Sequence, residues 1–479
     1  MKKVRTRFAP SPTGFMHLGG MRTALYSYLY AKKFDGDFIL RIEDTDQERF
    51  VEGAIEVIYS SLKEGGIIYD EGPDVGGDFG PYVQSERKQI YKKYAEMLVE
   101  KGAAYYCFCS KERLASLKDE RGVAKYDKHC LTLTKEEVQK NLDAGMPYVI
   151  RQNIPENGVG EYDDLVFGHI AVDYSEMEDN VLIKSDGMPT YNFANVVDDH
   201  LMGITHVMRG SEYLSSTPKY NLLYDAFGWA RPQYIHLSPI MKDATRKLSK
   251  RYGDANFDDF VKKGYLPAAI MNYIALLGWC PKDNVEKMTV PEMVEKFSLD
   301  GVSKAPAIFD DDKLRWLNGE YLKEMTDEEF LAVARPFIAK SKVYGKYDEL
   351  KIASLMKTRV TILSEIPEKI DFLEEYGEYD KALFFHKKMK TDEALAKEIL
   401  PLIRDTLDRI QNFTHDELHD GLIALAEKHG FKNGQVLWTA RVALTGKEVT
   451  PGGAIEMAEI LGKDRSIERI DFSIAMLNK

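Results

Sequence analysis

The sequence predicts an α/β domain with a parallel sheet, an α+β insertion within that domain and an all-α C-terminal region. Strand and helix signals alternate over residues 1–105, as in a parallel sheet covered by helices. Cysteines and short strand signals replace this pattern in residues 106–190, and α/β signals return in residues 191–255. From about residue 325 onward the strand signals fade and helical spacing dominates. A chain of 479 residues is too long for one core, so we expect about two to four domains.

The first part of the chain predicts a strand, a loop, a helix and a second strand. Residues 4–9 are compatible with a strand, and the loop after them, which ends at Gly20, contains three glycines, two prolines and His17. Apolar residues then recur at helical spacing, and residues 38–42 predict the second strand, which is followed by Glu43. Ligands of such βαβ units bind beyond the carboxyl ends of the strands, where His17 and Glu43 both fall. Because backbone N–H groups at a helix N-terminus can hold phosphate oxygens, the loop indicates a nucleotide site; the alternative is an ordinary turn.

Later segments supply the remaining elements. A capping box at Thr134 and Glu137 predicts a helix that ends at Gly145. Residues 265–280 are strongly apolar but shorter than the ~20 residues of a membrane span, so a buried helix is expected there. Short strand or α/β signals occur at residues 148–152, 180–183, 191–209 and 234–239.

The last third of the chain has the signals of helices alone. Thr326 with Glu329 and Thr414 with Glu417 form two further capping boxes, and Gly430 ends the second helix. A change from mixed to helical composition favours one or two separate C-terminal domains.

Charge and composition restrict the classes of function. The net charge of −12 argues against a generally basic nucleic-acid binder but does not exclude local Lys and Arg clusters. The basic N-terminus is followed by no apolar core, so we expect no signal peptide, no membrane association and a cytoplasmic location.

The four cysteines do not indicate a disulfide scaffold. Cys107, Cys109 and Cys130 cluster in the predicted insertion, which suggests a metal site. The alternative is that the three thiols pack as small hydrophobic groups. Cys280 stands alone and is expected to be a buried apolar residue.

A second basic motif gives the N-terminal loop a partner. Lys247–Arg251 follows a predicted strand, and by itself it is typical of a solvated basic run. Together with the N-terminal loop, this motif predicts a site for a nucleoside triphosphate. The leaving pyrophosphate needs counter-charge, which lysines on a loop can supply.

The two motifs together resemble the paired signatures of class I aminoacyl-tRNA synthetases. His17-Leu18-Gly19-Gly20 corresponds to the His-Ile-Gly-His motif, and Lys247–Arg251 corresponds to the Lys-Met-Ser-Lys-Ser motif. Other segments narrow the resemblance to bacterial glutamyl-tRNA synthetases, and it runs across essentially the whole chain. These segments are Arg7–Gly14, Arg41–Asp46, Asp186–His200, Thr205–Gly210, Phe309 with Lys313–Asn318, and Thr445–Lys447.

This resemblance implies a domain organisation and a reaction. A Rossmann-type catalytic domain would comprise residues 1–105 and 191–255, with an acceptor-end-binding insertion at 106–190. Residues 256–325 would contact the tRNA stem, and residues 326–479 would form an all-helical anticodon-binding region. The implied reaction uses ATP with Mg²⁺ to join L-glutamate to tRNA(Glu) in two steps through a glutamyl-adenylate, in a monomeric enzyme.

The resemblance also implies roles for individual residues. His17, Lys247 and Lys250 would be catalytic, and ATP would bind to Gly19, Gly20, Glu212, Ser249, Lys250 and Arg251. Arg7 and Arg209 would bind the glutamate carboxylate, which a guanidinium can grip in two places, and Glu43 would bind the amine. Tyr213 stands where many relatives have His or Trp, so it receives no role. Further glutamate-binding residues would be Ser11, Tyr191 and Asn195.

In some members of this family the cysteine cluster binds a structural zinc ion. The ligands would be Cys107, Cys109, Cys130 and either Tyr126 or His129. The spacing of the first two cysteines is tighter than usual for structural zinc, and Thr132 stands where one family arrangement has His.

Four alternatives need comparison. A glutaminyl-tRNA synthetase usually ends in β-barrels, which the helical tail disfavours, and a shortened tRNA-modifying relative lacks an anticodon domain. A non-catalytic tRNA-binding paralogue tends to lose the signature residues that this chain retains. A non-discriminating enzyme that also charges tRNA(Gln) with glutamate stays open.

Overall fold

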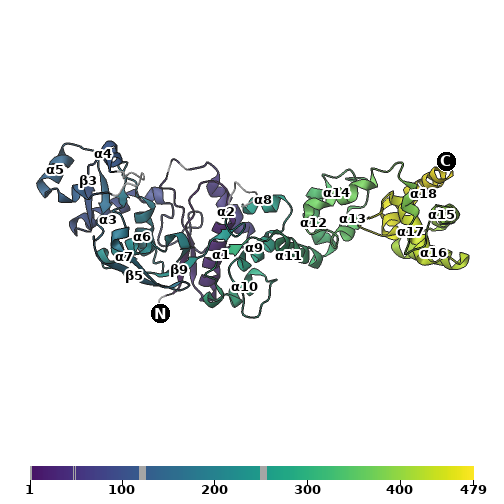
Figure 1. The fold of residues 1–479 in the computed structure, drawn as a ribbon, viewed down its shortest axis with the longest axis horizontal. Helices are drawn as coiled ribbons and strands as arrows, with labels where there is room; N and C mark the ends of the chain where they lie inside the picture. The colour runs from purple at the N-terminus through teal and green to yellow at the C-terminus, as the bar shows by residue number, and fades with distance from the viewer. Residues whose placement is uncertain (1–2, 47, 49, 118–125, 249–255) are drawn as a thin grey trace. The chain divides into compact units, whose positions relative to one another are not determined.

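The computed structural model describes residues 3–46, 48, 50–117, 126–248 and 256–479. The chain divides into two compact units (Figure 1). The first comprises residues up to 262 together with 267–311, and the second comprises residues 263–266 and 312–479. Within the described residues, no helix combines the length and the apolar character that crossing a membrane would require.

The predicted βαβ unit opens the first unit. β1 (Arg5–Phe8) pairs in parallel with β2 (Asp37–Leu40), and α1 (Leu18–Lys33) connects them. The apolar side of α1 is fully buried at Met21, Leu25 and Leu29, as its helical spacing predicted. β1 also lies beside β8 (His206–Gly210), because the backbone N–H of Thr205 donates to the carbonyl of Arg5 at 2.9 Å.

A four-stranded sheet completes the centre of this unit, with strand order β6-β5-β9-β8. β8 and β9 (Gln233–Leu237) are parallel and are joined by α7 (Thr217–Phe227). β5 (Val159–Asp164) and β6 (Gly168–Asp173) form an antiparallel hairpin within the range predicted as the insertion, but β5 pairs with β9. The sequence analysis did not predict this hairpin, because its acidic residues and glycines give no apolar run.

The insertion contains a separate antiparallel sheet of β3 (Ala104–Cys107), β4 (Val149–Gln152) and β7 (Val181–Ile183). Both of the strands predicted there are confirmed. α5 (Lys135–Asp143) begins with the predicted capping box, in which Thr134 and Glu137 bond reciprocally.

The other elements of the first unit surround these sheets. α9 is the predicted buried helix of residues 265–280, but Cys280 lies beyond its end and is exposed. The prediction of a buried Cys280 is therefore wrong, because the chain turns at Pro281 and leaves the thiol near Asn284. The bounds are α2 Ala54–Glu64, α3 Lys88–Glu100, α4 Lys111–Ser116, α6 Tyr191–Leu201, α8 Phe257–Lys262, α9 Pro267–Leu276, α10 Val290–Lys296, β10 Ile240–Met241 and β11 Ala307–Ile308.

The second unit is helical. Residues 312–479, all of which the structure describes, contain no β-strand. Thr326 and Glu329 form the predicted capping box, whereas at Thr414 only half of the box forms because the Glu417 carboxylate bonds Asn412 instead. The α-helices are α11 Asp311–Glu324, α12 Asp327–Ile338, α13 Glu349–Met356, α14 Ile366–Ile370, α15 Glu393–Arg409, α16 His415–His429, α17 Asn433–Thr445 and α18 Ala454–Asn478.

Short 3₁₀ helices lie between these elements. Their bounds are η1 Gln84–Arg87, η2 His129–Thr132, η3 Tyr174–Glu176, η4 Ser211–Tyr213, η6 Leu299–Gly301, η7 Leu363–Glu365, η8 Asp371–Leu373 and η9 Lys381–Phe384. The architecture confirms the predicted fold class, with a parallel-sheet domain, an α+β insertion and a helical C-terminal region.

Candidate active site

A cavity of about 420 Å³ lies where β1 and β8 end and α1 begins. Ser249, Lys250 and Arg251 were also predicted for the site, but they lie outside the described residues. Asn195 does not line the cavity; its amide donates to the carbonyl of Tyr191 at 2.5 Å within α6. The predicted residues that do line the cavity are Arg7, Ser11, His17, Gly19, Gly20, Glu43, Tyr191, Arg209, Glu212 and Lys247.

His17 is the N-cap residue of α1. Its Nδ1 accepts a hydrogen bond from the backbone N–H of Gly19 at 3.0 Å, so the neutral ring carries its proton on Nε2. A Cβ at Gly19 would lie 3.3 Å from this Nδ1, a tight contact that glycine avoids. The first turn of α1 contains no acidic residue, and its positive dipole end therefore favours an anion in the cavity.

Lys247 lines the same cavity as His17, although the two residues are far apart in the sequence. It forms an antiparallel bridge with Met241, and the N–H of Leu248 donates to the carbonyl of Ile240 at 3.1 Å. These backbone bonds place one lysine of the second motif at the cavity that contains His17.

The Arg209 guanidinium is a buried cation at the end of β8. Its Nη2 donates to Thr217 at 2.7 Å, and it lies 5.0 Å from the ring of Tyr213 and 4.8 Å from that of Tyr220. Burial disfavours its charge, but the neighbouring tyrosines, with Tyr191 first, raise the pKa of Arg209 above its ordinary value. Within the described part of the chain, Arg209 forms no ion pair with a carboxylate.

Other buried charges beside the cavity form ion pairs, whereas Arg22, which also lines the cavity, donates to the carbonyls of Leu277 and Ser238. Asp199 accepts from Arg7 at 3.1 Å and from Arg41 at 2.7 Å, and Glu43 accepts from Arg41 at 3.0 Å. Burial raises the pKa of Glu43, whereas Arg7 and Arg41 overcome burial and lower the pKa of Asp199. A further pair joins Arg87 to Asp198 at 2.7 Å.

Arg7, Arg41 and Arg87 are therefore paired with carboxylates, whereas Arg209 bonds neutral side chains. No role is predicted from the sequence for Arg41, Arg87, Asp198 or Asp199. A signal was present, because Arg41 follows an apolar strand and the two aspartates follow Val196 and Val197 on a helix. Charged residues at such positions are expected to be buried and paired.

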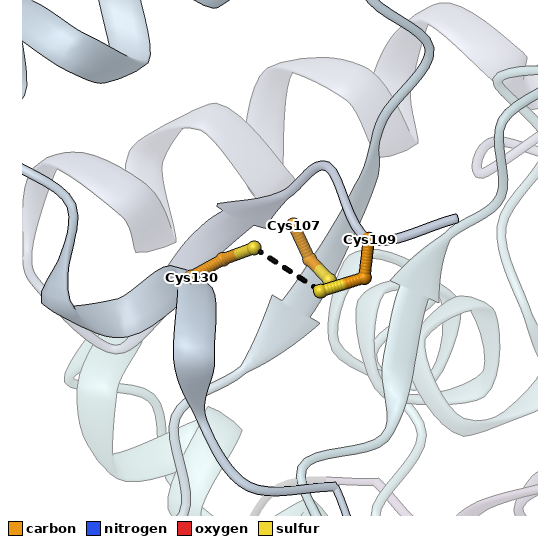
Figure 2. A group of neighbouring side chains, drawn as sticks. All are labelled: Cys107, Cys109 and Cys130. Carbon is orange, nitrogen blue, oxygen red and sulfur yellow. Dashed lines mark hydrogen bonds between the residues drawn. The ribbon is translucent and has the colours of Figure 1, made fainter. Parts of the chain in front are cut away.

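The three clustered cysteines converge in the insertion (Figure 2). All three Sγ atoms lie within 4.8 Å of one another, and those of Cys109 and Cys130 are 3.5 Å apart. The hydroxyl of Tyr126 lies 3.3 Å from Cys107 Sγ, whereas His129 is exposed and outside the group. The contact with Cys130 lowers the pKa of the Cys107 thiol, so the cluster favours a thiolate.

Known protein families match both units of the chain. Residues 3–316 match the family described as tRNA synthetases class I (E and Q), catalytic domain, and residues 316–474 match the anticodon binding domain. The chain belongs to the class I tRNA synthetases of the E and Q type. A glutamate–tRNA ligase of Clostridium tetani is 57% identical over 479 residues, which cover 99% of this chain and 98% of the relative. A glutamate–tRNA ligase of Clostridium botulinum is also 57% identical, with 99% of both chains covered.

A solved structure gives the same result. A crystal structure of a glutamate tRNA ligase from Elizabethkingia meningosepticum, in complex with its amino acid, aligns with a TM-score of 0.89 and 37% identity. It covers 99% of this chain and 100% of that chain. The synthetase match therefore includes the catalytic unit, with its cavity, and the helical region.

Proposed function

We propose that this synthetase is a glutamate–tRNA ligase that joins L-glutamate to tRNA(Glu) with ATP, through a glutamyl-adenylate. The observation that carries the choice of amino acid is the buried Arg209 guanidinium, which has no carboxylate partner within the described residues and lies at the cavity. Glutamate has a net charge of −1, and its side-chain carboxylate supplies the direct anionic partner that Arg209 lacks among the described residues. A buried cation without a partner is costly, and a substrate carboxylate removes that cost.

The remaining groups orient the amino acid. Arg209 binds the side-chain carboxylate, and Arg7 contributes the N–H groups that Asp199 does not use. The Glu43 carboxylate accepts a hydrogen bond from the substrate ammonium group. The positive charge of that group stabilises the ionised form of Glu43 despite its burial. Ser11 and Tyr191 add hydroxyl groups at the cavity wall. Asn195 acts through the backbone of Tyr191, since its amide bonds that carbonyl.

The first step needs positioning and charge stabilisation rather than a covalent nucleophile. An α-carboxylate oxygen of glutamate attacks the α-phosphorus of ATP, and the bond to pyrophosphate breaks. His17, the N-terminus of α1 with Gly19 and Gly20, and Lys247 surround the phosphates, and Lys250 assists by its place in the motif. Glu212, Ser249 and Arg251 complete the ATP site. Mg²⁺ bound with ATP neutralises the phosphate oxygens.

In the second step a terminal ribose hydroxyl of tRNA attacks the glutamyl carbonyl carbon, and AMP leaves. The helical unit, which matches an anticodon binding domain, holds the other end of the tRNA. The enzyme acts as a monomer in the cytoplasm.

The cysteine cluster holds a structural Zn²⁺. Three convergent thiols are the donors that zinc prefers, and the Tyr126 hydroxyl, rather than the exposed His129, stands near them as the fourth group. Zinc held by Cys107 on β3 and Cys130 on η2 would join these two segments.

A charging assay tests this function. Purified protein, ATP and labelled glutamate are incubated with purified tRNA(Glu) or tRNA(Gln), and acid-insoluble glutamate is measured. Glutamylation of tRNA(Glu) is expected, and label in neither tRNA contradicts the proposal. Label in tRNA(Gln) as well identifies a non-discriminating enzyme.

A further inference from the structure

A buried histidine and aspartate lie behind the candidate glutamate site and have no part in the mechanism above. His236, on β9, is 0% exposed, and Asp164, at the end of β5, is 3% exposed. The two strands are adjacent in the sheet, with Asp164 opposite Tyr234. His236 Nδ1 lies 2.7 Å from Asp164 Oδ2.

The pair fixes which imidazole nitrogen carries a proton. Because an ionised carboxylate only accepts hydrogen bonds, His236 donates through Nδ1–H, and its Nε2 is left as an acceptor. Arg209 Nε donates to that Nε2 at 3.1 Å. Protonation of Nε2 would place two N–H groups against each other, so the neutral ring with this tautomer is the one that fits.

Two contacts then hold the guanidinium in one orientation. His236 accepts from Nε and Thr217 accepts from Nη2 at 2.7 Å, which together use two of the five N–H donors of an arginine. These two contacts fix the plane of the guanidinium, and its further hydrogen-bond partner is Tyr191, which lines the cavity. Asp164 is fixed in turn, because its Oδ1 accepts from the N–H groups of Val166 and Phe167 at 2.9 and 2.7 Å.

We propose that Asp164 and His236 are positioning residues that hold Arg209, through the neutral Nδ1–H tautomer of His236, in the orientation that grips the carboxylate of the amino acid substrate. This inference rests on the proposed function, since it gives Arg209 the role of carboxylate ligand. It also gives the β5–β6 hairpin a role in substrate recognition.

Three substitutions separate positioning from general stability. In H236Q the amide oxygen can take the place of Nε2 and accept from Arg209, whereas H236L offers no acceptor. D164N places an amide N–H against Nδ1 and favours the wrong tautomer. The matched control is H169L, because His169 and Asp163 form an exposed pair of the same kind, 3.1 Å apart, on the same hairpin.

The readout is glutamate-dependent ATP–pyrophosphate exchange in the presence of tRNA(Glu), with the KM of glutamate and of ATP measured separately. H236L and D164N are expected to raise the glutamate KM about tenfold or more, since they leave a buried charged donor without its acceptor, and to leave the ATP KM within about threefold. H236Q and H169L are expected to stay within about threefold of wild type for both substrates.

The double variant H236Q/D164N gives a result that a merely structural role would not produce. Without an imidazole there is no tautomer to set, so D164N is expected to raise the glutamate KM less in this background than in wild type; its effect on the backbone N–H of residue 236, which donates to Asp164 Oδ2 at 3.1 Å, is common to both backgrounds. An unchanged glutamate KM in H236L or D164N, or equal losses in H236L and H236Q, would overturn the positioning role. Absence of glutamate-dependent exchange in the wild-type protein would instead overturn the proposed function as well.

Discussion

Arg7 Nε lies 3.1 Å from a carboxylate oxygen of Asp199, so one of the two arginines predicted to bind substrate is already ion-paired. Its Nη1 also donates to the carbonyl of Met208 at 3.0 Å. Arg209 is bonded to neutral partners instead. The two arginines are therefore unequal, and we propose Arg209 as the main cation of the amino acid site.

Replacing Arg209 tests this inequality. Arg209→Ala is expected to raise the glutamate KM about 100-fold or more, because truncating one partner of a buried hydrogen-bonded charge pair costs about 2–5 kcal/mol. The ATP KM should change little. The control is Arg231→Ala, which removes an exposed arginine paired with Asp225. An unchanged glutamate KM in Arg209→Ala would remove Arg209 from the amino acid site.

The Asp199 carboxylate has a mainly structural role, and its loss should show in stability. Asp199→Asn weakens the buried ion pairs with Arg7 and Arg41, and the expected loss in the free energy of unfolding is about 3–5 kcal/mol, measured by urea denaturation. Asp225→Asn breaks an exposed pair and should cost less than about 1 kcal/mol. Equal losses in the two variants would contradict this account of the buried network.

Lys250 is expected to act on the leaving pyrophosphate. Lys250→Ala should lower the turnover of the activation step by about 100-fold, the scale on which one preorganised group stabilises developing charge. The affinity for tRNA should stay near the wild-type value in a filter-binding assay. Lys282→Ala is a control, since this lysine is exposed. An equal loss of tRNA binding in Lys250→Ala would count against the assigned role.

Zinc content can be measured directly by plasma emission spectrometry of the purified protein. We expect about one zinc per chain, loss of zinc in Cys109→Ser and full retention in Cys280→Ser, because Cys280 is exposed and outside the cluster. Chelation should also lower the Tm of the wild-type protein. Purified protein without zinc would end this part of the proposal.

The buried imidazole of His236 makes stability depend on pH. Burial lowers its pKa below the ordinary value of 6.5, and the facing charged groups are Asp164, Arg209 and Glu212. The unfolded chain then binds a proton at a higher pH than the folded chain, so His236 contributes stability above pH 6.5 and loses it as the pH falls below that value. The Tm of wild type minus that of H236Q is expected to decrease from about pH 7.5 to about pH 5.5. A constant difference would show that His236 does not titrate in this way.

Local patterns predicted the elements that carry the first motif. The loop that contains His17, the helical spacing of α1 and the capping box at Thr134 depend on residues close together in the chain, and the structure confirms them, except that α1 begins at Leu18 and so includes Gly19 and Gly20, which were predicted as loop. The capping box at Thr414 is only partly correct, since Glu417 had a competing donor in Asn412. The sequence pattern cannot predict whether the Glu417 carboxylate accepts from the backbone N–H of Thr414 or from the N–H groups of Asn412.

Contacts between residues far apart in the chain could not be predicted from the sequence. Arg7 and Asp199 are separated by 192 positions, and nothing local predicts that their side chains meet. The β5–β6 hairpin was missed because its stability comes from pairing with β9 rather than from an apolar run. The pocket residues from five segments of the chain were identified through resemblance, and their shared cavity is visible only in the fold.

The central claim is that the cavity activates glutamate, and ATP–pyrophosphate exchange with added tRNA tests it most directly. The account predicts exchange that requires glutamate and falls about 100-fold or more with glutamine, which lacks the carboxylate that Arg209 pairs with. The assay should be run with and without tRNA, because relatives of this family often need tRNA for the exchange. Absence of glutamate-dependent exchange under both conditions, or equal exchange with glutamine, would contradict the account.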